Sequence, residues 1–297
     1  MRPSLRLGTI SGIHVGIHWS AAAIVVMLLV TLSGGILPEW APGYSSPTYA
    51  IVALVSSAMF LGSIVAHELG HSLVAQRGGI KVKAITLFAL GGVAQLESEP
   101  DNAPLAARIA LAGPAVSILI GAISLGTVAA VSPAFPPIAT AALGWLGIIN
   151  IGLGVLNMIP ALPLDGGRLL QSILWAKRGD RLTATISAAK VGRLLGNLIM
   201  LFGLWQFASG GGGLWTAMIG WFVSSTARSE MRWARHQLRQ REMGAAGVGW
   251  PFGQGQMWSW YSADRGAPAN SHEPVDVDVI EVEVIDPDTR SGPNFKS

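Results

Sequence analysis

The sequence contains one short run whose residue types and spacing could perform hydrolytic chemistry, His67-Glu68-Leu69-Gly70-His71. On a helix the two histidines lie four residues apart on one face, so their imidazoles can share a single zinc ion. Glu68 lies beside the first histidine and can act as general base on a water at such a metal. The run therefore predicts a zinc centre with His67 and His71 as ligands and Glu68 as a catalytic residue.

A catalytic zinc ion usually has a third protein ligand besides water. The chain has no cysteine, so a histidine or a carboxylate must supply this ligand. Asp165 is the favoured candidate because it follows Pro160 and Pro163, which interrupt a helix near the end of an apolar stretch. The pair Gly166-Gly167 comes next, and we expect it to let the chain turn closely against the metal. The other histidines that could supply the third ligand are His14, His18, His236 and His272.

The elements that must position these residues are predicted to cross a membrane. Hydrophobic residues make up 51% of the chain and charged residues only 12%, whereas soluble domains carry about 25% charged residues. Six apolar runs reach the roughly 17–25 residues that a bilayer requires. They cover about residues 17–36, 49–76, 105–131, 139–162, 184–208 and 212–229. The sequence thus predicts an α-helical polytopic membrane protein with about six transmembrane helices.

The distribution of basic residues predicts the orientation of these spans. The loops 37–48, 132–138 and 209–213 contain no Lys or Arg, so all 20 basic residues fall on the opposite side or near its span ends. The positive-inside rule then places both termini, and the opening of the site, in the cytoplasm. Because topology accounts for the basic residues, the net charge of +3 indicates no nucleic-acid partner.

Two segments outside the spans have a character of their own. Residues 81–97 are rich in β-branched and apolar residues around Gly91-Gly92, which predicts a small cytoplasmic β-hairpin or re-entrant segment. After residue 228 the chain becomes basic and then acidic, so we divide it into a membrane domain, 1–228, and a largely flexible tail, 229–297. Within that tail, residues 275–284 alternate as one exposed strand would.

Two motifs together resemble the site-2 protease family of intramembrane zinc metalloproteases. They are H-E-L-G-H at 67–71 and N-x-x-P-x-x-P-L-D-G-G at 157–167, and the resemblance covers about residues 12–228. It implies one zinc ion per chain, held by His67, His71 and Asp165, with Glu68 as the catalytic base. It further implies that Asn157 is a catalytic residue, positioning the substrate or its polarised carbonyl.

The resemblance also carries expectations about substrate and location. It implies hydrolysis of a peptide bond in the transmembrane segment of a single-span membrane protein, as in regulated intramembrane proteolysis. The expected partners are a transmembrane-helix substrate and the lipid bilayer, and the expected location is a bacterial plasma membrane. The hairpin around Gly91-Gly92 resembles one whose edge pairs with an unwound substrate. The chain resembles the six-span branch of the family, without a PDZ-like or paired CBS module.

Two other functions are compatible with polar residues inside the membrane. A divalent-cation or proton-coupled transporter could use the same His/Glu/Asp cluster, although its members lie at one membrane face instead of along a path. A catalytically inactive membrane scaffold is the other alternative, and the presence of Glu68 argues against it.

Overall fold

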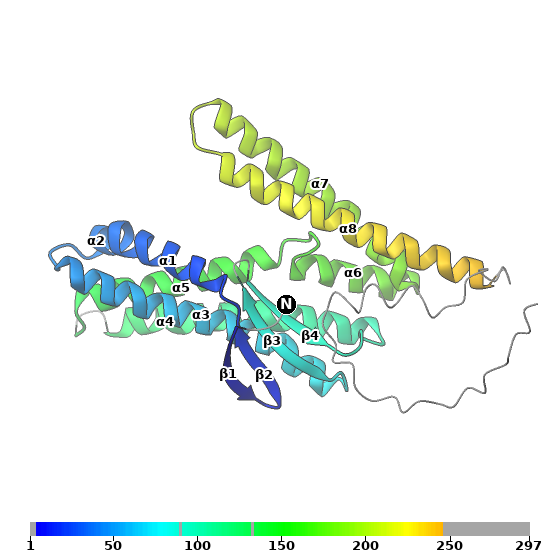
Figure 1. The fold of residues 1–297 in the computed structure, drawn as a ribbon, viewed down its shortest axis with the longest axis horizontal. Helices are drawn as coiled ribbons and strands as arrows, with labels where there is room; N and C mark the ends of the chain where they lie inside the picture. Colours follow the sequence, from blue (N-terminus) through cyan, green and yellow to red (C-terminus); the bar gives the residue numbers. More distant parts are fainter. Residues whose placement is uncertain (1–3, 89–90, 132–133, 246–297) are drawn as a thin grey trace, which may run out of the picture. The chain divides into compact units, whose positions relative to one another are not determined.

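The computed structural model describes residues 4–88, 91–131 and 134–245 (Figure 1). Its strands are β1 (Leu5–Ile10), β2 (Ile13–Ile17), β3 (Val82–Phe88) and β4 (Gly91–Leu96). Its helices are α1 (Ala21–Thr31), the π-helical η1 (Leu32–Ile36), α2 (Leu37–Trp40), α3 (Ser46–Arg77), α4 (Ala103–Val131), α5 (Pro137–Asn157), α6 (Asp165–Arg178), α7 (Arg181–Ala208) and α8 (Leu214–Ala245).

Five helical stretches in the described part of the chain are long and apolar enough to cross a bilayer. They are Ala21–Trp40, Ser46–Arg77, Ala103–Ala130, Pro137–Asn157 and Arg181–Ala208, and they match the first five predicted spans. The sixth span, predicted over 212–229, is not confirmed. It coincides with the start of α8, whose apolar part ends at Arg228 and is shorter than the roughly 17 residues a bilayer requires.

The strands form one sheet in the order β1-β2-β3-β4. The predicted segment 81–97 is indeed a hairpin, because β3 and β4 pair antiparallel with Leu87 opposite Gly92. Its position on the cytoplasmic side stays a prediction. No pattern in the sequence indicated that β2 pairs parallel to β3, with Val15 opposite Ile85, or that β1 completes the sheet. In this order β4 is an edge strand, and the hairpin is part of a four-stranded sheet.

A break between α5 and α6 interrupts the fourth predicted span. We expected that span to run to residue 162, but α5 ends at Asn157 and a turn over 158–164 follows. Pro160 and Pro163 lie in this turn, where neither can continue an α-helix. Since α6 then begins at Asp165, the turn determines where the Asp165 carboxylate lies.

Two hydrophobic clusters attach the sheet and the turn to the helices. Buried residues of β2 and β3 pack on α3 and α4; the cluster consists of Ile13, Ala75, Ile80, Val82, Ile85, Leu105 and Ile109. A second cluster joins Leu162 of the α5–α6 turn to Ala188 and Ala189 of α7 and to Met231 of α8. The hairpin of α7 and α8 therefore supports the turn that precedes Asp165.

Part of the predicted C-terminal region lies outside the described residues. α8 continues through residue 228 to Ala245 without interruption, while the acidic part of the tail and its predicted strand at 275–284 lie beyond. The division of the chain at residue 228 stays a prediction.

Candidate metal centre

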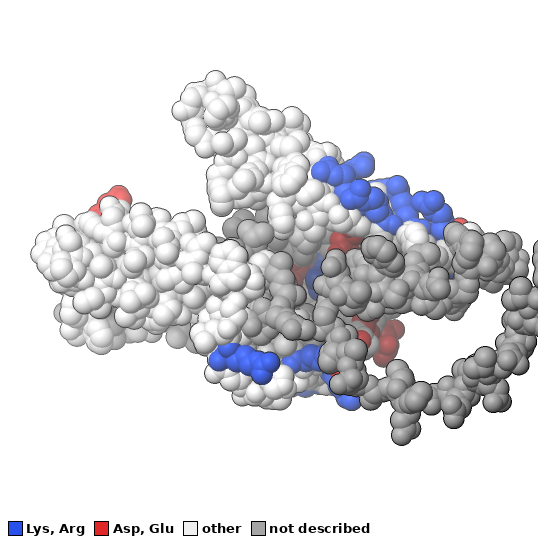
Figure 2. Space-filling view, in the orientation of Figure 1, with Lys and Arg blue, Asp and Glu red and all other residues white. Residues whose placement is uncertain are grey.

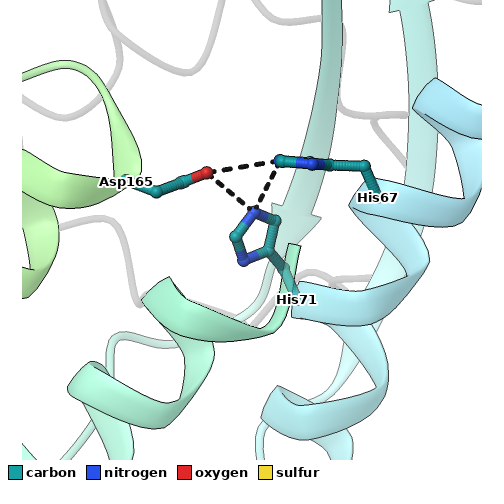
Figure 3. A group of neighbouring side chains, drawn as sticks. All are labelled: His67, His71 and Asp165. Atoms are coloured by element: carbon teal, nitrogen blue, oxygen red, sulfur yellow. Dashed lines mark hydrogen bonds and ion pairs between the residues drawn. The ribbon is translucent and has the colours of Figure 1, made fainter. Parts of the chain in front are cut away.

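Three side chains converge where α3 meets the start of α6 (Figure 3). His67 and His71 lie one turn apart on α3, and their Nε2 atoms are 3.2 Å apart. Oδ2 of Asp165 lies 3.2 Å from each of these two nitrogens. The structure therefore brings together the three residues that the sequence predicted as metal ligands, in a nearly equilateral triangle.

The triangle has the size and chemistry that zinc requires. Zinc binds imidazole nitrogen and carboxylate oxygen at about 2.0–2.1 Å, so two ligands of a tetrahedral site are about 3.3–3.4 Å apart. The 3.2 Å edges agree with this spacing. The space beside the triangle is open because Gly113 of α4 faces it: a Cβ atom there would lie 2.6 Å from His67 Nε2. The arrangement can thus accept a zinc ion with one position left for water or substrate.

Helix α4 orients both imidazole rings through oxygen atoms that lie beside their Nδ1 atoms. His71 Nδ1 lies 2.6 Å from the carbonyl oxygen of Ile109, and His67 Nδ1 lies 2.8 Å from Ser117 Oγ. When Nδ1–H donates to these oxygens, Nε2 of each ring keeps its lone pair for a metal. Sequence reasoning missed both partners, because nothing in the spacing of α4 indicates which of its residues face α3.

Asp165 occupies the first turn of α6, where the helix dipole stabilises a carboxylate. Burial alone would raise the pKa of Asp165, but the neighbouring imidazoles of His67 and His71 outweigh burial and hold that pKa below its ordinary range. The carboxyl group is therefore ionised at neutral pH, as a metal ligand must be.

Gly166 and Gly167 follow Asp165 at a point where the backbone packs very closely. A Cβ atom at Gly166 would lie 2.5 Å from the carbonyl oxygen of Ile159, and one at Gly167 would lie 2.7 Å from that of Ala161. Both glycines therefore let α6 pack against the backbone of its own preceding turn. Their contribution to the site is to hold Asp165 close to that turn.

The side chain of Glu68, which follows His67 on α3, lies against Gly92 of the edge strand β4. This side chain is half-buried, and a Cβ atom at Gly92 would lie 2.8 Å from Glu68 Cδ. Gly92 therefore makes room for the carboxylate, and a chain lying along β4 would pass close to it. The sequence showed the Gly91-Gly92 pair but not its proximity to Glu68.

The remaining predicted residues are not members of the metal-ligand cluster found in the described part of the chain. Asn157 is the last residue of α5, half-buried, and within the described residues it makes no hydrogen bond to His67, His71 or Asp165. The alternative third ligands do not join the cluster. His14 is exposed and bonds Thr9, and His18 bonds Ser20. His236 is exposed on α8, and His272 lies outside the described residues.

Comparison with known proteins agrees with this geometry. The model of Peptidase family M50 matches residues 55–142 and 132–202. The chain is 40% identical over 237 residues to a Mycobacterium tuberculosis protein that is named as the zinc metalloprotease Rip3. The match covers 77% of this chain and 59% of the relative. A Synechocystis protein also named as a zinc metalloprotease is 39% identical over 237 residues, covering 78% of this chain and 61% of the relative.

A solved structure is similar to this chain in both fold and sequence. The site-2 protease from Methanocaldococcus jannaschii superposes with a TM-score of 0.51 at 32% sequence identity, covering 76% of this chain and 94% of that one. The chain spans about three fifths of the length of the first two curated relatives.

Proposed function

The chain belongs to the site-2 proteases of Peptidase family M50, which are zinc metalloproteases, and from this premise we propose that it cleaves a peptide bond within the transmembrane segment of a single-span membrane protein. The observation that carries the proposal is the triangle of His67, His71 and Asp165, with edges of 3.2 Å, at the end of apolar helices. A hydrolytic centre at this position can reach peptide bonds that lie inside a membrane.

In the proposed reaction each residue has a separate role. His67, His71 and Asp165 would hold one zinc ion, which when bound would polarise the scissile carbonyl and lower the pKa of water toward about 7. Glu68 accepts the proton of the attacking water and delivers it to the leaving amine nitrogen. Asn157, at the end of α5, positions the carbonyl of the substrate in this proposal.

The position of β4 supports the proposal that substrate binds as an added strand. A transmembrane helix hides its peptide groups in its own hydrogen bonds, so it must unwind locally before it can be cut, and its freed groups need new partners. β4 is an edge strand whose outer backbone groups can supply those partners. Since Gly92 of β4 lies beside Glu68, an added strand would bring a peptide bond to the general base.

We further propose that the substrates are membrane-tethered regulators, that cleavage follows an earlier cut elsewhere, and that the site opens toward the cytoplasm of a bacterial cell. The absence of Lys and Arg from the loops 37–48, 132–138 and 209–213 supports this orientation.

The decisive experiment compares the wild-type chain with Glu68→Gln. Both proteins are purified, their zinc content is measured, and cleavage of a single-span substrate is followed in proteoliposomes. We expect Glu68→Gln to keep one zinc per chain and to lose cleavage, while the matched variant Glu39→Gln, at an exposed acid on α2, keeps both. Cleavage by a zinc-loaded Glu68→Gln protein would contradict the role of Glu68. A wild type that cleaves no membrane peptide but transports zinc would favour the transporter instead.

A further inference from the structure

The hairpin of α7 and α8 changes from apolar to basic at one level on both helices. The helices run antiparallel in close contact, because a Cβ atom at Gly196 would lie 2.9 Å from the carbonyl oxygen of Gly220. Asn197 accepts a hydrogen bond from Ser224 at 2.7 Å, which fixes the same register. In this register Arg193 of α7 and Arg228 of α8 lie at equivalent heights.

On α8 one face continues across this level. Its apolar part carries Leu214, Met218 and Trp221, which are 62%, 47% and 56% exposed. With 3.6 residues per turn, the same face then carries basic side chains for three further turns. These are Arg228, Arg232, Arg235 and Arg239.

Helix α7 repeats the pattern in the opposite chain direction. Leu194, Leu198, Leu201 and Trp205 form an exposed apolar face at helical spacing. Lys190 continues this face by one turn, and exposed Arg193 lies next to it. We name the basic side chains that lie on or next to these two faces, at and beyond this level, the basic band; it consists of Lys190, Arg193, Arg228, Arg232, Arg235 and Arg239.

Acidic side chains of the described residues do not form ion pairs with the basic band. Within the described residues, the ion pairs that involve α7 or α8 join Arg181 to Glu99 and Arg241 to Asp180, and none involves the band. Among the described residues, Arg228 donates a hydrogen bond to the hydroxyl of Ser224, and Arg232 donates one to the hydroxyl of Ser229. The carboxylate of Glu230 lies on the opposite face of α8, and Glu242 lies beyond the end of the band. Figure 2 shows the blue side chains gathered along the second half of α8, next to the white part of the hairpin.

We infer that the basic band is a binding surface for the headgroups of anionic phospholipids, with the exposed apolar faces of α7 and α8 in contact with their acyl chains. The charge is complementary to phosphate, and the band continues the exposed apolar faces of α7 and α8, which are complementary to acyl chains. The headgroup layer is about 5–8 Å thick, so Lys190, Arg193, Arg228 and Arg232 lie within it and the outer arginines lie just beyond. This inference does not depend on the proteolytic function.

The test measures lipid preference of the full-length protein. The delipidated protein, in neutral detergent, is titrated with phosphatidylglycerol or phosphatidylcholine, and bound lipid is counted by native mass spectrometry. Each basic side chain at an anionic surface strengthens binding by about fivefold. We therefore expect wild type to prefer phosphatidylglycerol by more than about tenfold, and Lys190→Gln/Arg193→Gln/Arg232→Gln to lose this preference. Arg228 is kept because it bonds Ser224.

A matched variant separates the basic band from general charge. Arg6→Gln/Arg77→Gln/Lys81→Gln removes the same charge from exposed positions on the sheet and at the end of α3, and it should keep the preference. Equal binding of both lipids by wild type, an undiminished preference in the first triple variant or an equal loss in the matched one would each overturn the inference. Should the first triple variant fail to fold, Arg232→Gln alone tests the same point, with an expected loss of about fivefold.

Discussion

Substitution of Gly192, which lies on α7 outside both sequence motifs, should weaken zinc binding from a distance. A Cβ atom at this position would lie 2.7 Å from the carbonyl oxygen and 2.8 Å from the nitrogen of Leu162. Both atoms belong to the backbone of the turn that carries Asp165, and no flexible side chain can move aside to relieve the contact. Gly192→Ala must therefore displace the turn or separate it from α7.

The size of the effect follows from these distances. Nonbonded atoms rest at about 3.5 Å or more, so the turn must move by roughly 0.7 Å. Zinc–ligand distances tolerate only about 0.2 Å. We expect a loss of zinc affinity of about tenfold or more, comparable to the loss of an outer-shell partner. The roughly 1 kcal/mol by which alanine is favoured over glycine within a helix offsets part of the cost of this displacement.

The assay is competition for zinc against a chromophoric chelator, with the protein in detergent. Gly152→Ala is the matched control, since a Cβ atom at this glycine of α5 meets nothing within 4 Å. We expect the control to bind zinc as wild type does. If Gly192→Ala also binds zinc within twofold of wild type, then α7 does not position Asp165 and the reasoning is refuted.

Three further predictions concern the same site and its support. Ser117→Ala removes the oxygen 2.8 Å from His67 Nδ1 and should lower zinc affinity by about 10–100-fold in the chelator assay; an unchanged affinity would contradict the orienting role. Gly113→Ala places a methyl group 2.6 Å from His67 Nε2, so the purified variant should be folded but contain no zinc, and one zinc per chain would refute this. The backbone N–H of Thr183 lowers the pKa of Asp180, so this N-cap stabilises α7 at pH above about 4 and loses its effect on acidification. Asp180→Ala should therefore lower the free energy of unfolding by about 1 kcal/mol at pH 7, with the difference from wild type shrinking below pH 4; a constant difference would argue against the cap.

The sequence predicted the helices better than it predicted the sheet. Apolar runs identified five spans because a bilayer imposes a minimum length on any crossing helix. The strand pairing of β2 with β3 joins residues 14–17 to 84–87, across the whole of α3. No local pattern specifies such a pairing, because either strand alone could lie against several partners. The sequence therefore predicted the β3–β4 hairpin but not the four-stranded sheet that contains it.

The candidate site divides in the same way. The four-residue spacing of His67 and His71 follows from helix geometry and is readable from the sequence. Asp165 could be placed near them because its chain break lies at the same end of a span. The partners of the two imidazoles are Ile109 and Ser117. Which residues of α4 face α3 depends on the orientation of α4 about its axis, and this orientation cannot be predicted from the sequence.

Small residues explain how elements from distant parts of the chain can meet at one metal site. Gly70 of α3 packs against α4, since a Cβ atom there would lie 3.0 Å from the carbonyl oxygen of Ala112. Gly113 leaves the space beside the imidazoles, Gly92 leaves space for Glu68, and Gly192 allows α7 to touch the turn before Asp165. Inside a membrane, helices associate by close packing, which small residues permit. Each of these contacts lets two elements that carry or support site residues approach closely, so the glycines contribute to the site geometry although none of them can bind the metal through a side chain.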